Sequence, residues 1–210
     1  MAGDKTNVII DKLAKISSII FHPVFIPVYG MIIIFSAPTL LGYLPFKVKK
    51  LLLLIVLINN VLLPVSLLPL FRYKNLISSW TINSRIERNI PIIISSLLYL
   101  LTSFIIFRLP IPVFLKSFII AVFILSVIIT LINFWWKISL HSAGVGALVS
   151  LVVILAFKMY TPLVWYLISV VIIAGLVLSS RLRLNSHSPL QVWVGFLAGI
   201  LGLSLSMMVI

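Results

Sequence analysis

Long apolar segments, each ended by a short polar or basic stretch, follow one another along most of the chain. Each has about the 17–25 residues that a helix needs to cross the hydrocarbon core of a bilayer. The pattern therefore predicts an all-α polytopic membrane bundle of six to seven transmembrane helices, forming one domain over residues 23–210. The predicted spans are Val24–Leu44, Leu51–Phe71, Pro91–Phe107, Val113–Phe134, His141–Phe157, a sixth that follows the Lys158–Pro162 turn and ends at Leu178, and Leu190–Ile210.

Residues 1–22 have a different pattern and are expected to form a separate N-terminal amphipathic segment. In Asn7–Ile20 the apolar residues recur at helical spacing, while Asp11, Lys12 and Lys15 interrupt them. An interfacial helix is predicted, because a signal peptide would have an uninterrupted apolar region. His22, just before Pro23, is interpreted as a residue that starts the first span.

The order of the spans predicts which polar segments meet. If residues 91–134 form a hairpin around the Arg108–Pro112 turn, three polar segments emerge on one face of the bundle. They are Arg72–Asn89, Lys137–Ser142 and Ser180–Leu190. A simple count of basic residues predicts that this face lies in the cytoplasm. When the candidate phosphate ligands are left out of the count, the two faces carry nearly equal numbers of basic residues.

Composition restricts the chemistry further. The chain is 62% hydrophobic and carries a formal net charge of +13, with 16 Lys and Arg against three carboxylates and no cysteine. The basic residues lie in short loops between spans, which favours anionic lipid headgroups or a phosphate substrate over nucleic acid. Three carboxylates are too few for a paired-carboxylate mechanism or a carboxylate-bound metal, and the three histidines include no close ligand pair. No metal and no cofactor is therefore expected.

The three polar segments contain the side chains that phosphoryl chemistry requires. Guanidinium groups pair with phosphoryl oxygens, and two histidines suit a transfer in which one attacks phosphorus and the other protonates the leaving oxygen. A serine at the start of a helix leaves free backbone N–H groups that can also bind phosphate. The candidates are Arg85, Arg88, Lys137, Ser139, His141, Arg181 and His187.

The spacing of these residues resembles that of the type 2 phosphatidic acid phosphatases, relatives of the vanadium haloperoxidases. Ser180-Arg181, five residues, His187, three residues and Gln191 match the third motif of that family, with glutamine in place of aspartate. The helix Val192–Gly199 is similar to the small-residue helix after that motif. Ser139 and His141 resemble part of the second motif, while Arg85 and Arg88 before Pro91 take the place of the first without its spacing. The resemblance covers about residues 72–199.

The resemblance implies a role for each candidate. His187 would be the nucleophile that forms a phosphohistidine, and His141 the acid for the leaving group. Gln191 would orient His187 through its amide oxygen without supplying the negative charge of the family aspartate. The phosphoryl oxygens would be bound by Arg181, Arg88, Arg85, Ser139 and Lys137. Glu87 is expected to form a salt bridge with Arg85 or Arg88.

The expected function is a metal-independent, membrane-embedded lipid phosphatase acting on a phosphomonoester or pyrophosphate lipid, such as an anionic phospholipid or a polyprenyl phosphate. The alternative is a weakened or inactive homologue that binds or transports an anionic lipid with the same arginines. The expected location is the bacterial inner (cytoplasmic) membrane. The family resemblance favours an outward-facing site, against the simple count of basic residues, and both orientations stay open.

Overall fold

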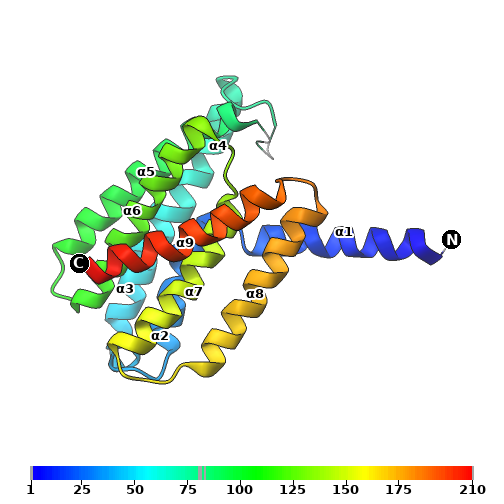
Figure 1. The fold of residues 1–210 in the computed structure, drawn as a ribbon. Coiled ribbons are helices and arrows are strands. Elements are labelled where there is room, and N and C mark those ends of the chain that lie inside the picture. The colour runs from blue at the N-terminus through cyan, green and yellow to red at the C-terminus, as the bar shows by residue number, and fades with distance from the viewer. Residues whose placement is uncertain (1, 80–81, 83, 210) are drawn as a thin grey trace.

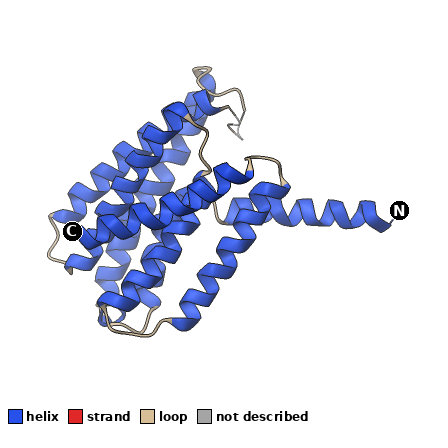
Figure 2. Ribbon diagram, viewed as in Figure 1, coloured by secondary structure: helices blue, strands red, loops and turns tan. Residues whose placement is uncertain are grey.

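The protein is an all-helical bundle in a computed structural model that describes residues 2–79, 82 and 84–209, with side chains from residue 7 onward. The chain is 83% helical, and the described residues contain no strand (Figures 1 and 2). The elements are α1 Ala2–Ile20, the 3₁₀ turn η1 Pro23–Phe25, α2 Ile26–Ser36, the 3₁₀ turn η2 Leu40–Tyr43, α3 Phe46–Leu57, the π-helical turn η3 Ile58–Leu62, α4 Leu63–Tyr73, α5 Arg85–Phe107, α6 Val113–Trp135, α7 Leu140–Lys158, α8 Val164–Arg183 and α9 Pro189–Val209.

Seven segments of the described chain are long and apolar enough to cross a membrane. This confirms the predicted all-α membrane bundle, and the chain is an integral membrane protein by the length and composition of its helices. The first of these segments, Asn7–Ser36, joins α1 to α2 across the bend at Phe21–Phe25. The last residue of the predicted seventh span, Ile210, lies outside the described residues.

The prediction of a continuous helix over Val24–Leu44 is wrong. The helix there is α2, with only 11 residues, and it ends where Ala37 adopts an extended conformation. Pro38 follows, and the ring of a proline disfavours the helical conformation of the residue before it. Eleven residues rise only about 16 Å, which is too short to cross the hydrocarbon core.

Two further predicted boundaries are shifted. The second span begins at Phe46 and continues through the π-helical turn Ile58–Leu62 into α4, so its basic lysines lie in the first turns of the helix. The third span begins at Arg85, because Pro91 lies inside α5 instead of starting it. The predicted α5–α6 hairpin is present, with hydrogen bonds of 3.0 Å between the Ser96 and Thr130 hydroxyls and 2.9 Å between the Asn133 and Asn89 amides.

Helix α7 is the most buried of the long helices and packs closely against α9. The approach depends on glycine, because an added Cβ at Gly146 or Gly199 would collide with a backbone carbonyl of the opposite helix. At Gly195 an added Cβ would lie 2.7 Å from the carbonyl oxygen of Ser139. Small residues at such spacing allow membrane helices to bring their backbones together. The start of α9 is thereby fixed against the start of α7.

Helix α1 extends away from the rest of the bundle and packs against the C-terminal end of α8 (Figure 1). Its buried residues are Ala14 and Ser18, which continue a stripe that begins with Asn7 and Asp11. This 4-3-4 spacing places the four side chains on one helical face. The large apolar side chains of α1 lie on the exposed face, as expected for a helix that contacts lipid. They are Val8, Ile9, Ile10, Leu13, Ile16, Ile19 and Ile20.

Candidate functional site

The three predicted polar segments meet at one end of the bundle. The backbone N–H of Ser139, before α7, donates a 3.3 Å hydrogen bond to the carbonyl of Gln191 in the first turn of α9. The charges of Arg88 on α5, Lys137 between α6 and α7, and Arg181 on α8 all act on the His187 imidazole. The folded chain therefore gathers side chains from three separate segments of the sequence, as the order of the spans predicted.

His187 lies in the loop between α8 and α9, and only 7% of its surface is exposed. Its Nδ1 is 3.1 Å from Oε1 of Gln191. Since an amide oxygen only accepts, this contact requires a proton on Nδ1 and leaves the lone pair of Nε2 free. The same Oε1 accepts a 3.2 Å hydrogen bond from the backbone N–H of Ser188, which fixes the glutamine in turn. Gln191 thus makes the orienting contact that was predicted for it.

Burial of the imidazole, and then the charges of Arg88 and Arg181, lower the pKa of His187 to about 4. The hydrogen bond with Gln191 acts in the opposite direction but does not outweigh them. His187 is therefore a neutral imidazole at pH 7, the form in which Nε2 is a nucleophile. Burial and the same two arginines also lower the pKa of the Lys137 ammonium.

Positive charge dominates this end of the protein. Among the described residues, no carboxylate acts on His187 or Lys137. Asp11 forms an ion pair with Arg183, and the carboxylate of Glu87 accepts from the backbone N–H and hydroxyl of Ser78. Three cations close together without a described carboxylate among them form a site for an anion.

Arg181 is the most enclosed of these cations, with 9% of its surface exposed. Its Nη1 donates a 3.1 Å hydrogen bond to the hydroxyl of Ser18 on α1. Its Nε is buried and has no hydrogen-bond partner among the described residues. A buried guanidinium with an unused donor is costly unless a ligand completes its hydrogen bonds. An anion with several oxygens, such as a phosphoryl group, supplies such acceptors.

Ser139 caps the start of α7 and is fully buried. Its hydroxyl accepts from the backbone N–H of Ser142 at 3.4 Å and from the Ser142 hydroxyl at 2.8 Å. The predicted helix start is therefore present. The Ser139 hydroxyl stabilises the first turn of α7, which carries His141, and so contributes to the position of that ring.

His141 lies at the start of α7, and its Nε2 is 3.0 Å from the backbone carbonyl of Ser18. Because the carbonyl can only accept, Nε2 carries the proton and Nδ1 is the ring nitrogen left for exchange with a ligand. The charge of Arg181 acts on this ring, which places it in the same cluster. The structure thus brings together His141, His187, Gln191, Arg181, Arg88 and Lys137.

The structure does not bring Arg85 into this cluster. Its Nη1 donates to the backbone carbonyl of Phe134 and, at 3.5 Å, to that of Asn133, at the end of α6. A guanidinium satisfies the unpaired carbonyls that every helix leaves at its C-terminus. The predicted salt bridge from Glu87 to Arg85 or Arg88 is also wrong: Glu87 contacts Ser78, and Arg88 Nε donates to the carbonyl of Ile82 at 2.9 Å.

Two residues from the N-terminal segment belong to the cluster and were not predicted. The ring of His22 is in edge contact with that of His141, with centroids 5.3 Å apart, and the charges of Arg181 and Arg88 act on it. Its Nδ1 accepts from the N–H of Val24 at 3.4 Å, so it also starts η1, as interpreted. The other residue is Ser18, whose 4-3-4 stripe with Asn7, Asp11 and Ala14 was the available sequence signal.

The donor set suits an anion better than a metal ion. Within the described residues, no three His, Cys, Asp or Glu side chains are arranged to hold a metal. Each cation of the cluster offers only hydrogen-bond donors, and Gln191 uses its oxygen on His187 and Ser188. What the arrangement can do chemically is bind a group with several negative oxygens next to a neutral, oriented imidazole.

Comparison with known proteins gives no relative for this chain: no protein-family profile, curated protein or solved structure matches it.

Proposed function

We propose that this protein is a metal-independent lipid phosphatase that works through a phosphohistidine on His187. The observation that carries the proposal is the His187–Gln191 contact inside a cluster of three cations. It combines a buried, neutral imidazole of fixed orientation with charges that bind phosphoryl oxygens. Neither feature alone would suggest transfer, since cations alone bind anions and an isolated imidazole binds none.

The reaction has two steps. In the first, the Nε2 lone pair of His187 attacks phosphorus, an N–P bond forms, and the P–O bond to the leaving group breaks. The leaving oxygen takes the Nδ1 proton of His141, which enters this step as an imidazolium and leaves it as a neutral ring that keeps its Nε2 proton on the Ser18 carbonyl. In the second, water attacks the phosphohistidine and gives a proton back to His141, while the N–P bond breaks and inorganic phosphate leaves. Arg181, Arg88 and Lys137 stabilise the negative oxygens throughout.

The substrate class follows from where the site lies. The cluster is at one end of a bundle of membrane helices, where lipid headgroups are found. A phosphomonoester or pyrophosphate carried by an anionic phospholipid or a polyprenyl chain would present its phosphate at this depth. We propose that the protein acts in the bacterial inner membrane.

The experiment is phosphate release from a panel of lipid phosphates, with a chelator present, by the wild type, His187→Ala and Ser186→Ala. Ser186 lies in the same loop and is the matched control. The proposal predicts release that survives the chelator, is lost with His187→Ala, and is kept in Ser186→Ala. It also predicts an acid-labile phosphoenzyme in the wild type and in Ser186→Ala, and none in His187→Ala. Full activity in a folded His187→Ala protein would eliminate His187 as the nucleophile.

One observation favours a second function, the binding or transport of an anionic lipid without turnover. The partner of His187 is an uncharged amide, so no described carboxylate offsets the positive charge of the imidazole in the phosphohistidine. In triad enzymes, replacing the carboxylate behind the histidine by its amide lowers the rate about 10⁴-fold. A protein with this function would bind lipid phosphates and release no phosphate at any pH tested.

A further inference from the structure

One residue of α1 touches two members of the candidate site. The Ser18 hydroxyl accepts a 3.1 Å hydrogen bond from Arg181 Nη1, and the Ser18 backbone carbonyl accepts one of 3.0 Å from His141 Nε2. These contacts connect positions separated by 163 and 123 residues. Ser18 is itself buried, with 9% of its surface exposed.

We infer that Ser18 is a positioning residue: it aims the Arg181 guanidinium and fixes the protonation of His141, so that α1 completes the site. The inference rests on the proposed function of that site. Ser18 does not touch the substrate; it acts through the two side chains that do.

The direction of the hydrogen bonds explains why a hydroxyl is suited to this position. The Ser18 hydroxyl donates its proton to the carbonyl of Ala14 at 2.9 Å, one turn earlier in α1. Its lone pairs therefore face Arg181, and it offers that guanidinium an acceptor without a negative charge. A carboxylate here would neutralise Arg181 and compete with the phosphate. A serine holds the guanidinium and leaves its charge available.

Arg181 depends on this contact because the other described residues around it provide few hydrogen-bond acceptors. Its Nε is buried without a hydrogen-bond partner in the described part of the chain. Without the Ser18 acceptor, the guanidinium loses a contact that restrains it before the ligand arrives. Preorganised donors bind an anion more tightly than donors that must first be ordered.

The backbone carbonyl of Ser18 acts on His141 in a complementary way. It requires a proton on Nε2, which leaves Nδ1 as the nitrogen that exchanges a proton with the leaving group. The backbone carbonyls inside a helix accept hydrogen bonds from the same helix, but those of its last turn do not. Because α1 ends at Ile20, the carbonyl of Ser18 lies in the last turn and can accept from His141. The end of α1 is therefore placed where both contacts can form.

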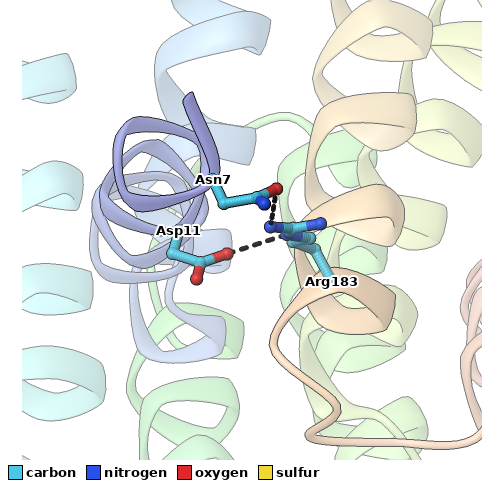
Figure 3. A network of polar contacts seen from close by, with 3 residues as sticks. All are labelled: Asn7, Asp11 and Arg183. Atoms are coloured by element: carbon cyan, nitrogen blue, oxygen red, sulfur yellow. Dashed lines mark hydrogen bonds and ion pairs between the residues drawn. The ribbon is translucent and has the colours of Figure 1, made fainter. Parts of the chain in front are cut away.

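A second set of contacts keeps α1 on α8. Arg183, two residues beyond Arg181, donates from Nε to Asp11 at 2.7 Å and from Nη2 to Asn7 at 2.9 Å (Figure 3). Asn7, Asp11 and Ser18 lie on the same stripe of α1. The interface thus joins two arginines of α8 to one polar face of α1, and only the inner arginine reaches the site.

The test is binding of inorganic phosphate and of orthovanadate by the full-length protein in detergent, measured by calorimetry, together with steady-state turnover. The variants are Ser18→Ala, Ser18→Thr, Arg181→Ala and the double variant Ser18→Ala/Arg181→Ala. Ser17→Ala is the matched control, because the neighbouring Ser17 hydroxyl is buried but has no hydrogen-bond partner among the described residues.

We expect Ser18→Ala to weaken phosphate binding roughly tenfold, the effect of one charge-assisted hydrogen bond. Ser18→Thr restores binding, because threonine keeps the hydroxyl, and Ser17→Ala binds like the wild type. In the Arg181→Ala background, Ser18→Ala has no further effect, since Ser18 acts through Arg181. A loss caused only by local unfolding of α1 would persist in that background and would not be rescued by threonine.

The outcomes separate the two proposals. A wild type that binds phosphate, with Ser18→Ala binding equally well, would overturn the role of Ser18 and leave the phosphatase proposal standing. If Ser18→Ala weakened phosphate binding equally in the wild-type and Arg181→Ala backgrounds, the role of Ser18 would likewise be overturned and the phosphatase proposal would stand. A wild type that neither binds phosphate nor releases it from any lipid would overturn the proposed function, and the role of Ser18 with it.

Discussion

Two helix interfaces flank the candidate site, and different forces hold them. Between α7 and α9, glycines bring the two backbones together, and Gly146 and Gly199 leave no space for a Cβ. Between α1 and α8, the contacts are polar: Ser18 with Arg181, and Asn7 and Asp11 with Arg183 (Figure 3). The first interface is close-packed along its length, and the second depends on a few side-chain hydrogen bonds.

Because of this difference, we expect the part of the candidate site between α7 and α9 to be more rigid than the part held by α1. His141 and Gln191 lie in the first turns of α7 and α9, and His187 lies two residues before α9. Backbone contact fixes this region, as the hydrogen bond from Ser139 to Gln191 illustrates. Arg181 is held from the side of α1 by a single hydroxyl. Substitutions in the first interface should therefore threaten the fold, and those in the second should alter ligand binding first.

The largest effect is expected for Gly199→Ala. The new methyl would collide with the carbonyl of Ala143, and a backbone atom cannot rotate away as a side chain can. Overpacking of this kind costs about 3 kcal/mol or more when helices must separate. We expect a clear loss of thermal stability in detergent and of folded yield, measured by melting and by size-exclusion chromatography.

The control for this prediction is Gly175→Ala on α8, where an added Cβ meets nothing within 4 Å. Alanine is the better helix former by about 1 kcal/mol, so this variant should be as stable as the wild type or more so. Equal stability of the two variants would contradict the close packing of α7 on α9.

The sequence predicted the parts of the site whose position follows from the order of the helices. Once the spans and the α5–α6 hairpin were recognised, Arg88, Lys137 and Arg181 had to emerge at the same end. The contact from His187 to Gln191 was expected from the family resemblance, and the spacing allows it, because only three residues lie between them at the start of a helix. Such local and topological relations need no knowledge of how side chains pack.

The errors and omissions come from packing between distant segments. Arg85 is one turn from Arg88 but faces the end of α6, and only the register of α5 against α6 decides this. Ser18 and His22 join the site because α1 lies along α8, more than 150 residues later in the chain. The short α2 is an omission of another kind: Pro38 gave the signal, but the apolar pattern continued past it.

A smaller effect is expected for Gln191→Asp, which tests the rigid part of the site without disturbing its packing. A carboxylate beside Nδ1 stabilises the imidazolium, so it should raise the pKa of His187 above its value of about 4. At pH 7 the ring stays neutral and nucleophilic, while the carboxylate offsets the positive charge of the phosphohistidine. We expect phosphate release to increase roughly tenfold or more.

The pH dependence checks the same prediction. In the wild type, His187 remains neutral as the pH falls from 7 to about 5, and turnover should decline only as the pH approaches about 4. In Gln191→Asp the decline should begin at a higher pH. Nuclear magnetic resonance of labelled histidine measures the two titrations without reference to activity. A His187 that titrates near pH 6.5 in the wild type would mean that the neighbouring cations do not act on it as described.

The smallest effect is expected for Asp11→Asn, which removes the charge from the outer contact of α1 with α8. The Asp11–Arg183 pair has side chains that are 48% and 41% exposed, and such pairs contribute about 0–1 kcal/mol. Asparagine keeps an oxygen that can accept from Arg183, so melting in detergent should hardly change. Phosphate binding should also stay within about twofold, since Ser18 still holds Arg181. A tenfold loss of binding in Asp11→Asn, with stability unchanged, would show that the ion pair controls the docking of α1, and that the flexible side of the site is held from its outer end.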